Sequence, residues 1–147
     1  MQLDIILRTY DQGSLHGRDF DKPKKEITQR CVNSLLKAIV DGVDLTIVDD
    51  HSSPETLALL GKVVTLKDTG NNASLAKTFE LAANSKADAV YLVEDDYLHY
   101  PYAISEAMET FEYFQQMSSK EDICLNLVDC PANYHRDGYV GGGRGRD

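Results

Sequence analysis

The feature that most constrains the fold of this chain is the alternation of short apolar runs with longer segments of helical periodicity. Five runs have the length and composition of buried strands. They are Leu3–Leu7, Leu45–Val48, Val63–Leu66, Ala89–Val93 and Ile123–Val128. Because strands and helices alternate, we expect an α/β protein with a mostly parallel sheet of about five strands flanked by helices.

Residues that start and stop helices separate the first strands. Asp21 and Pro23 supply a cap and a first-turn proline for one helix, and Gly42 ends it. Ser53 as a cap and Pro54 at the first position start a short second helix. The pattern therefore predicts a helix in each of the first two intervals between strands.

Two longer helices are predicted further along the chain. One covers residues 73–85 and directs Leu75, Phe79 and Ala82 inward. The other is opened by Pro101, which suits the first turn of a helix. These two helices complete the alternating pattern.

Composition places limits on the class of protein. With 147 residues, 42% hydrophobic and 27% charged, the chain is an ordinary globular one. We expect one α/β domain over residues 1–130 and a Gly/Arg-rich tail over residues 131–147. The formal net charge of −9 argues against nucleic-acid binding, which needs clustered Lys and Arg. A nucleotide remains compatible, because a divalent ion can bridge carboxylates and phosphates.

Cysteine and histidine usage points away from disulfides and zinc. Cys31, Cys124 and Cys130 include no close pair, and the first two fall in apolar patterns, so we expect reduced, buried thiols in an intracellular, cytoplasmic protein. His51 and His99 lack zinc-ligand spacing and are expected at the surface.

No apolar run approaches roughly 18 residues, so we expect no transmembrane segment. Exposed apolar surface favours association, so a homodimer is a further expectation.

The fourth predicted strand runs directly into three carboxylates, Glu94, Asp95 and Asp96. Adjacent like charges repel each other, so a cation commonly offsets them, and oxygen ligands favour Mg²⁺, Mn²⁺ or Ca²⁺. Alternating side-chain directions would separate Asp95 from the other two while the strand lasts. The structural alternative is a solvated acidic turn.

Polar and acidic residues follow the other predicted strands as well. In open α/β sheets, ligands bind beyond the carboxyl ends of the strands. We therefore expect one site at that edge, built from the strand ends. The groups that follow the remaining strands are Arg8–Tyr10, Asp49–Asp50, Asp68–Asn72 and Asp129.

Four of these segments resemble the nucleotide-sugar half of GT-A fold glycosyltransferases, in particular the inverting family 2 enzymes. Arg8–Tyr10 resembles the loop that contacts the base, and residues 46–56 (TIVDDHSSPET) resemble the loop whose aspartate accepts the uracil imide hydrogen. Residues 71–79 (NNASLAKTF) resemble a loop and helix of the same half. Residues 90–101 (VYLVEDDYLHYP) resemble the strand that carries the DXD-type metal motif. The resemblance implies a Rossmann-like GT-A core over residues 3–101. It makes residues 1–130 a nucleotide-sugar-binding domain, and residues 131–147 either a flexible tail or the start of a missing acceptor region.

The resemblance implies a role for each nucleotide-facing residue. Thr9 and Tyr10 would line the base pocket, with Tyr10 stacking on the ring, and Asp50 or Asp49 would accept from uracil. Lys77 stands where the family has arginine and would face the diphosphate as a point charge. The alternatives are a plain loop aromatic for Tyr10, a turn cap for one of the two aspartates, and a solvated helix lysine for Lys77.

A metal-dependent reaction is also implied by the resemblance. Asp96 would be the principal ligand of Mn²⁺ or Mg²⁺, with Asp95 near the ribose or the metal and Glu94 beside them. The ion would bridge the two phosphates and stabilise the departing nucleoside diphosphate. The implied enzyme transfers a sugar from a nucleoside-diphosphate sugar, expected to be UDP-linked, to an unknown acceptor with inversion.

Two other functions stay open at this stage. The leading hypothesis is this glycosyltransferase or its donor-binding core. The first alternative is a nucleotide-sugar-binding remnant without turnover. A Mg²⁺-binding receiver-like signalling domain fits less well, because that class places an acidic pair after the first strand. An inverting enzyme also needs a base that deprotonates the acceptor, and the late candidates are Asp129, His135 and Asp137.

Overall fold

The computed structural model describes residues 1–12, 22–117, 123–125 and 127. All strand pairs in these residues are parallel, and the strand order is β3-β2-β1-β4. This confirms the predicted α/β class with a Rossmann-like parallel sheet flanked by helices. The elements are β1 (Leu3–Thr9), α1 (Lys24–Ala38), β2 (Val43–Asp49), α2 (Pro54–Leu60), β3 (Val64–Thr65), α3 (Asn71–Asn84), β4 (Ala89–Glu94) and α4 (Ala103–Met117).

The described residues form four strands rather than the predicted five. Ile123, Cys124, Leu125 and Leu127 belong to no strand, and Asn126 and Val128 lie outside the described residues. An apolar run is compatible with a strand, but a strand exists only where its backbone is paired with a neighbour, which the run itself does not specify. In the described residues β4 pairs with β1 alone.

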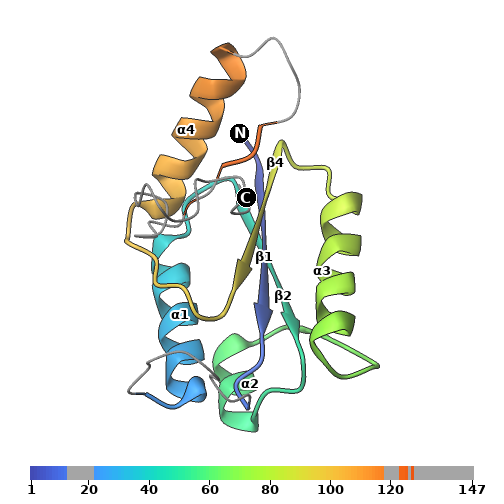
Figure 1. Cartoon of the computed structure of the whole chain (residues 1–147). Helices are drawn as coiled ribbons and strands as arrows, with labels where there is room; N and C mark the ends of the chain where they lie inside the picture. Colours follow the sequence, from blue (N-terminus) through green and yellow to red (C-terminus); the bar gives the residue numbers. More distant parts are fainter. Residues whose placement is uncertain (13–21, 118–122, 126, 128–147) are drawn as a thin grey trace, which may run out of the picture.

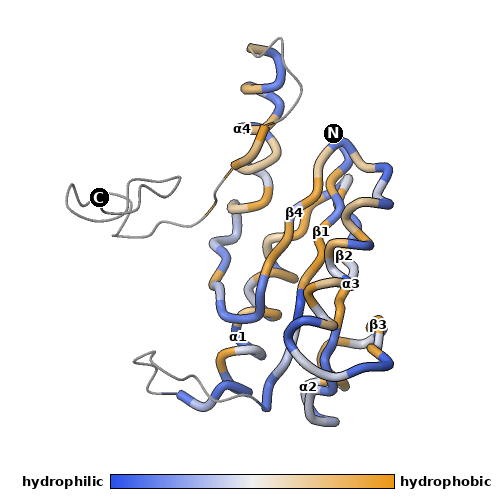
Figure 2. Tube along the Cα trace, turned by 45° about the vertical axis from the view of Figure 1, so that its right-hand side comes forward, coloured by the Kyte–Doolittle hydropathy of each residue, from blue (hydrophilic) through white to orange (hydrophobic). Residues whose placement is uncertain are grey.

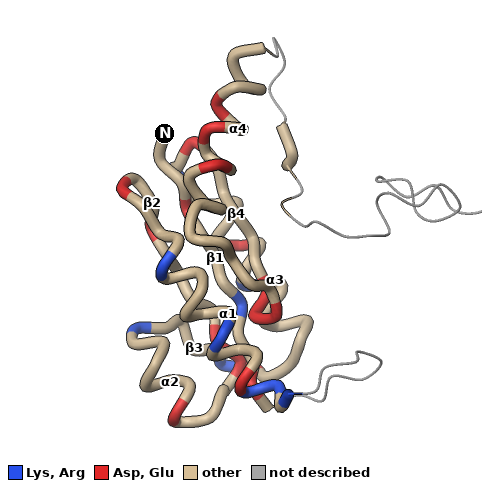
Figure 3. The backbone as a smooth tube through the Cα atoms, turned by 90° about the vertical axis from the view of Figure 1, so that its left-hand side faces the viewer, with Lys and Arg blue, Asp and Glu red and all other residues tan. Residues whose placement is uncertain are grey.

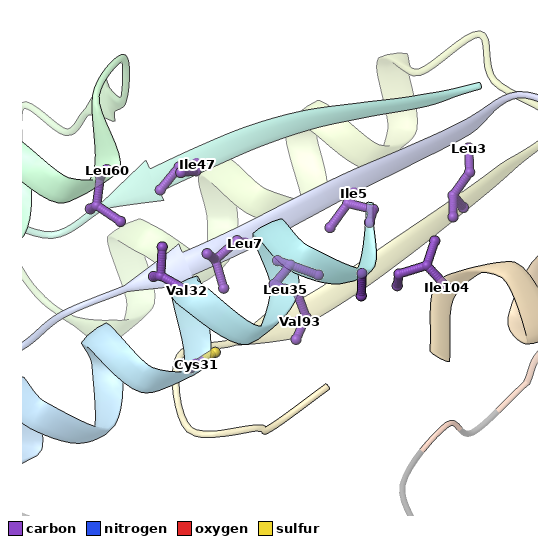
Figure 4. Packing of buried hydrophobic residues seen from close by; sticks show 11 residues of the cluster. Leu3, Ile5, Leu7, Cys31, Val32, Leu35, Ile47, Leu60, Val93 and Ile104 are labelled. Carbon is purple, nitrogen blue, oxygen red and sulfur yellow. The ribbon is translucent and has the colours of Figure 1, made fainter. Parts of the chain in front are cut away.

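The sheet lies between two layers of helices. Figure 1 shows α1 and α4 on one side of the sheet and α3 on the other. On the first side, alternate residues of β1 (Leu3, Ile5 and Leu7) meet Val32 and Leu35 of α1 in the buried core, as the close view shows (Figure 4). The remaining members of this cluster are Cys31, Ala38, Ile47, Leu60, Val93 and Ile104.

The inward face of α3 differs from the prediction. Leu75 and Phe79 are 37% and 54% exposed, and Ala82 is only partly buried. Ser74 and Thr78 face the sheet instead and are buried. The buried Thr78 hydroxyl is satisfied because it donates to the Ser74 carbonyl at 2.9 Å. The hydrophobic pattern thus predicted the wrong buried face for this helix.

The predicted helix ends are close to those observed. Pro23 immediately precedes α1, while Asp21 lies outside the described residues. Gly42 stands in the turn after α1 with φ of 85°, a conformation that glycine adopts without strain. Helix α4 begins at Ala103, two residues after Pro101, because residues 101 and 102 form a turn.

The register brings the carboxyl ends of three strands to one level. Thr9 of β1 lies opposite Asp49 of β2, and Arg8 lies opposite Glu94 of β4. Figure 2 shows hydrophobic strands whose lower, carboxyl ends pass into hydrophilic segments. Polar side chains from distant parts of the chain are therefore assembled at this edge.

Two further expectations have outcomes in the fold. Cys31 is buried, and burial raises the pKa of its thiol to about 12, whereas Cys124 is exposed, contrary to the prediction; Cys130 lies outside the described residues. Within the described ranges, none of the helices combines the length and apolarity needed to cross a membrane.

Candidate functional site

A cleft of about 640 Å³ opens at the carboxyl ends of β1, β2 and β4. Two segments lie across it, the loop after β2 and the turn that leads into α3. Asp50 and Asp96, which come from different strands, share this one cleft. Of the residues to which the sequence assigned a nucleotide or metal contact, those that line it are Thr9, Tyr10, Asp50, Glu94, Asp95 and Asp96.

The buried side chain of Asp95 links the carboxyl ends of β4 and β1 to α1. Its Oδ2 accepts hydrogen bonds from the Tyr10 backbone N–H at 2.9 Å and the Thr28 hydroxyl at 2.7 Å. Its Oδ1 pairs with Lys24 Nζ at 2.5 Å, and both side chains are nearly buried. Its carboxylate is thus held by protein donors on both oxygens.

Arg8 and Glu94 form a second charge pair inside the cleft. The guanidinium of Arg8 bonds to Glu94 through Nη2. Its Nη1 also donates to Asn71 Oδ1 at 2.5 Å and lies 3.4 Å from Ser74 Oγ. Arg8 therefore ties the carboxyl ends of β1 and β4 to the first turn of α3.

The two aspartates after β2 have different tasks. Asp49 is fully buried, accepts from Thr9 Oγ1 at 2.7 Å and from the Ser52 N–H at 2.9 Å, and so caps the turn that follows it. Asp50 lines the cleft, where both of its oxygens accept from the Gly70 N–H at 2.9 and 3.0 Å. Gly70 has φ of 110°, which favours glycine at this position. Asp50 therefore positions the turn that precedes α3.

Tyr10 and Lys77 have separate outcomes. The Tyr10 side chain lines the cleft and is 41% exposed, so its ring is accessible to a ligand. Lys77 lies outside the lining, and its Nζ pairs with Glu80 at 2.8 Å on the surface of α3. This position favours the alternative of a solvated helix lysine.

The histidines were both expected at the surface. His51 lines the cleft with a 43% exposed side chain and has φ of 63°, in the left-handed region that histidine enters more readily than most residues. His99 contradicts the expectation, because its ring is partly buried against Tyr91 and its Nδ1 is a buried atom without a partner in the described part of the chain.

No individual role was predicted for Arg8 and Lys24, which line the cleft, or for Asp11, which lies outside its lining. Arg8 lies at the end of the first strand, and Lys24 lies in the first turn of α1, where a cation interacts unfavourably with the helix dipole and where Asp95 compensates its charge. Asp11 is buried and accepts from the Ser53 N–H at 2.8 Å, the Ser53 hydroxyl at 2.5 Å and the Thr56 hydroxyl at 2.5 Å. It thereby anchors the start of α2, and no short-range sequence motif predicts this contact.

The predicted metal ligands do not form a ready-made shell. Glu94 is paired with Arg8, and both oxygens of Asp95 accept from protein donors. Within the residues that the structure describes, no group of three or more His, Cys, Asp or Glu side chains is placed to hold a metal ion. These carboxylates, as arranged, do not fit a three-carboxylate site, and metal binding stays a prediction.

The late candidates for a catalytic base, Asp129, His135 and Asp137, lie outside the described residues, as does the tail at 131–147. Comparison with known proteins adds no identification: neither a protein-family model nor a curated protein matches this sequence.

Proposed function

We propose that this chain binds a nucleoside-diphosphate sugar, with UDP as the expected nucleotide, and forms the donor-binding core of an inverting glycosyltransferase. The observation that carries the proposal is the convergence of Tyr10, Asp50 and Asp96 on one cleft. These residues come from three of the separate segments that resemble the donor half of GT-A enzymes. Side chains opening on different faces of the molecule would have removed the basis for it.

The exposed side chain of Tyr10 supplies the first contact with the nucleotide. An aromatic side chain at the mouth of a cleft offers a flat apolar surface on which a nucleobase can stack. Asp50 lies across the same cleft, and its carboxylate retains lone pairs beyond those used by the Gly70 N–H. Such an acceptor suits the imide N–H of uracil, in agreement with the UDP that the resemblance implies.

Arg8, Lys24 and the start of α3 supply hydrogen-bond donors for the diphosphate. Arg8 carries five N–H donors and Lys24 carries three, so each can keep its carboxylate partner and still donate to a phosphate oxygen. Gly70 and Asn71, at the amino-terminal end of α3, also line the cleft, where the helix dipole favours negative charge. Figure 3 shows basic and acidic positions interspersed around the amino-terminal part of α1, where Lys24 begins the helix.

The charge balance of the cleft predicts how binding depends on divalent cations. Among the described residues that line it are the carboxylates Asp50, Glu94, Asp95 and Asp96, opposed by the cations Arg8 and Lys24. This excess of negative charge repels a free diphosphate. UDP should therefore bind more tightly with Mn²⁺ present than without it.

Calorimetric titration of the full chain with UDP, CDP, ADP and GDP, each with and without Mn²⁺, tests the proposal. We expect UDP with Mn²⁺ to bind most tightly, and Asp96→Asn to weaken that binding by about tenfold or more, a loss of roughly 1.4 kcal/mol. The matched control is Asp41→Asn, which removes the same charge from an exposed turn at the opposite end of β2.

Equal UDP affinity in wild type and Asp96→Asn would remove Asp96 from the site, and no affinity for any nucleotide would overturn the proposal. Hydrolysis or transfer from a UDP-sugar measured on the same sample separates an enzyme from a binding remnant. Tight binding without turnover would favour the remnant.

A further inference from the structure

A second cavity, of about 610 Å³, lies between the segment that joins β4 to α4 and the first turns of α4. Among the described residues, four of the eight tyrosines of a chain that has no tryptophan line it. We call this cavity the aromatic groove. The residues that define it here are Tyr91, Tyr97, His99, Tyr100, Tyr102 and Glu106.

The floor of the aromatic groove is fixed in place. The rings of Tyr91 and His99 meet edge to face with centroids 5.9 Å apart, and the Tyr91 hydroxyl lies 3.1 Å from His99 Nε2. The His99 backbone N–H donates to Ser34 Oγ of α1 at 3.0 Å. The Ala103 N–H donates to the Tyr100 carbonyl at 3.0 Å. The segment is therefore tied both to α1 and to the start of α4, so a ligand would meet a largely preformed surface.

The rim, by contrast, presents aromatic rings to solvent. Tyr100 and Tyr102 are 70% and 54% exposed, and their rings lie parallel within 6° with centroids 5.7 Å apart. Exposed aromatic rings beside a cavity cost free energy in water, so a grouped set of them marks a binding surface more often than chance exposure does. The groove has the mixture of aromatic walls and few polar groups that small-molecule sites show.

We propose that the aromatic groove binds a saccharide. A sugar ring has a face of C–H groups that packs on a tyrosine ring and a rim of hydroxyls that need hydrogen-bond partners. Tyrosine hydroxyls, the Glu106 carboxylate and the Thr110 hydroxyl lie around the groove to meet that need. Among the described residues that line the groove there is no Lys or Arg, which disfavours an anionic ligand such as a phosphate or a nucleic acid.

The position of the groove gives this saccharide a role. Asp96 lines the cleft and Tyr97, the next residue, lines the groove, so the two sites adjoin along the chain. In this one respect the inference rests on the proposed function: if the cleft holds the sugar donor, the saccharide in the groove is the acceptor. Binding of the saccharide itself does not depend on that step.

Amide NMR titration of the full chain tests the groove, with methyl glycosides of glucose, galactose and N-acetylglucosamine and with maltose as probes at millimolar concentration. We expect at least one probe to cause saturable shifts confined to residues 97–110 and their neighbours. Tyr100→Ala and Tyr102→Ala should each weaken that binding about fivefold to tenfold, the size of one lost aromatic contact.

The matched control is Tyr113→Ala, which removes an equally exposed tyrosine of α4 that does not line the groove. A wild-type-like spectrum for each variant shows that it is folded. The proposal is overturned if no probe causes saturable shifts, if Tyr113→Ala weakens binding as much as Tyr100→Ala, or if the short-chain lipid diheptanoyl phosphatidylcholine shifts these residues and the sugars do not. UDP titrated into the same sample separates the two proposals: sugar binding without UDP binding keeps the groove and ends the acceptor role.

Discussion

The cleft and the aromatic groove are neighbours along the chain but are built in opposite ways. The cleft is held by charges and hydrogen bonds between distant segments, such as Lys24 with Asp95 and Arg8 with Glu94. The groove is held by ring contacts, such as Tyr91 with His99, and by the hydrogen bond that the His99 backbone N–H donates to Ser34 of α1. The Lys24–Asp95 pair is nearly buried, and such a pair fixes geometry at a high desolvation cost, whereas ring contacts are cheaper and individually weaker.

This difference indicates how each site should respond to change. Removing one member of a buried pair leaves its partner charged and poorly solvated, so damage to the cleft should reach global stability. Removing an exposed ring of the groove leaves nothing uncompensated, so the loss should appear in ligand binding and hardly in stability. The predictions below test that contrast.

The largest effect is expected for Asp95→Ala. This change leaves Lys24, whose side chain is 13% exposed, without its carboxylate and removes the acceptor of the Tyr10 N–H and the Thr28 hydroxyl. We expect a loss of about 3 kcal/mol or more in the free energy of unfolding, measured by urea denaturation.

A surface pair provides the control for that measurement. Glu80→Ala breaks the exposed ion pair with Lys77 and should cost less than about 0.5 kcal/mol. Tyr100→Ala belongs in the same series, and its stability should stay close to that of wild type. If Asp95→Ala cost no more than Glu80→Ala, the cleft would not depend on buried charge and the contrast would fail.

A smaller effect is expected for Asp11→Ala, which removes the acceptor that anchors the start of α2. Three hydrogen bonds from Ser53 and Thr56 are lost, and we expect a cost of about 2 kcal/mol at pH 7 by urea denaturation. The change should act on the loop that flanks the cleft and leave saccharide binding in the groove unaltered.

The pKa of Asp11 gives this prediction a pH dependence. Burial acts to raise the pKa, but hydrogen bonds from Ser53 and Thr56 outweigh it, and the pKa lies below its ordinary value of 3.8. The carboxylate therefore stabilises the fold above that ordinary value, and this contribution is lost as the pH falls through the lowered pKa. Between pH 6 and pH 3, wild type should lose more stability than Asp11→Asn; an equal loss would contradict the assignment.

The same comparison explains what could be predicted from the sequence. The cleft was located because parallel strands place their carboxyl ends at one edge, so Asp50 and Asp96 had to approach each other once the strands were recognised. The contacts that hold it were not predictable, because Asp11, Lys24 and Arg8 find their partners across long stretches of chain. Nothing in the local pattern around these residues names those partners.

Other misses have equally physical reasons. Hydrophobicity alone predicts that Leu75 and Phe79 face inward, whereas the buried side chains of α3 are the smaller Ser74 and Thr78. The sequence does not predict the aromatic groove although its residues are close in the chain. A run of tyrosines after a strand does not show beside which face of the next helix the tyrosines will lie. His99 was placed at the surface for lack of zinc spacing, which says nothing about burial.

The smallest effect on stability is expected from His99, whose partly buried ring lines the groove. Burial lowers the pKa of its imidazole below the ordinary value of 6.5. The unfolded chain then binds a proton more readily than the folded chain, so stability is full above that value and is lost as the pH falls through it toward the lowered pKa. Wild type should lose stability between pH 7.5 and pH 5, within about the usual titration range of histidine.

Substitution shows whether that loss belongs to the groove. His99→Phe keeps a ring against Tyr91 and cannot be protonated, so its stability should change less over this interval than that of wild type. His51→Asn removes the histidine of the cleft, with a residue that tolerates the left-handed backbone there, and should retain the loss. The reverse result, a loss that disappears in His51→Asn and persists in His99→Phe, would move the neutral-pH sensitivity from the aromatic groove to the cleft.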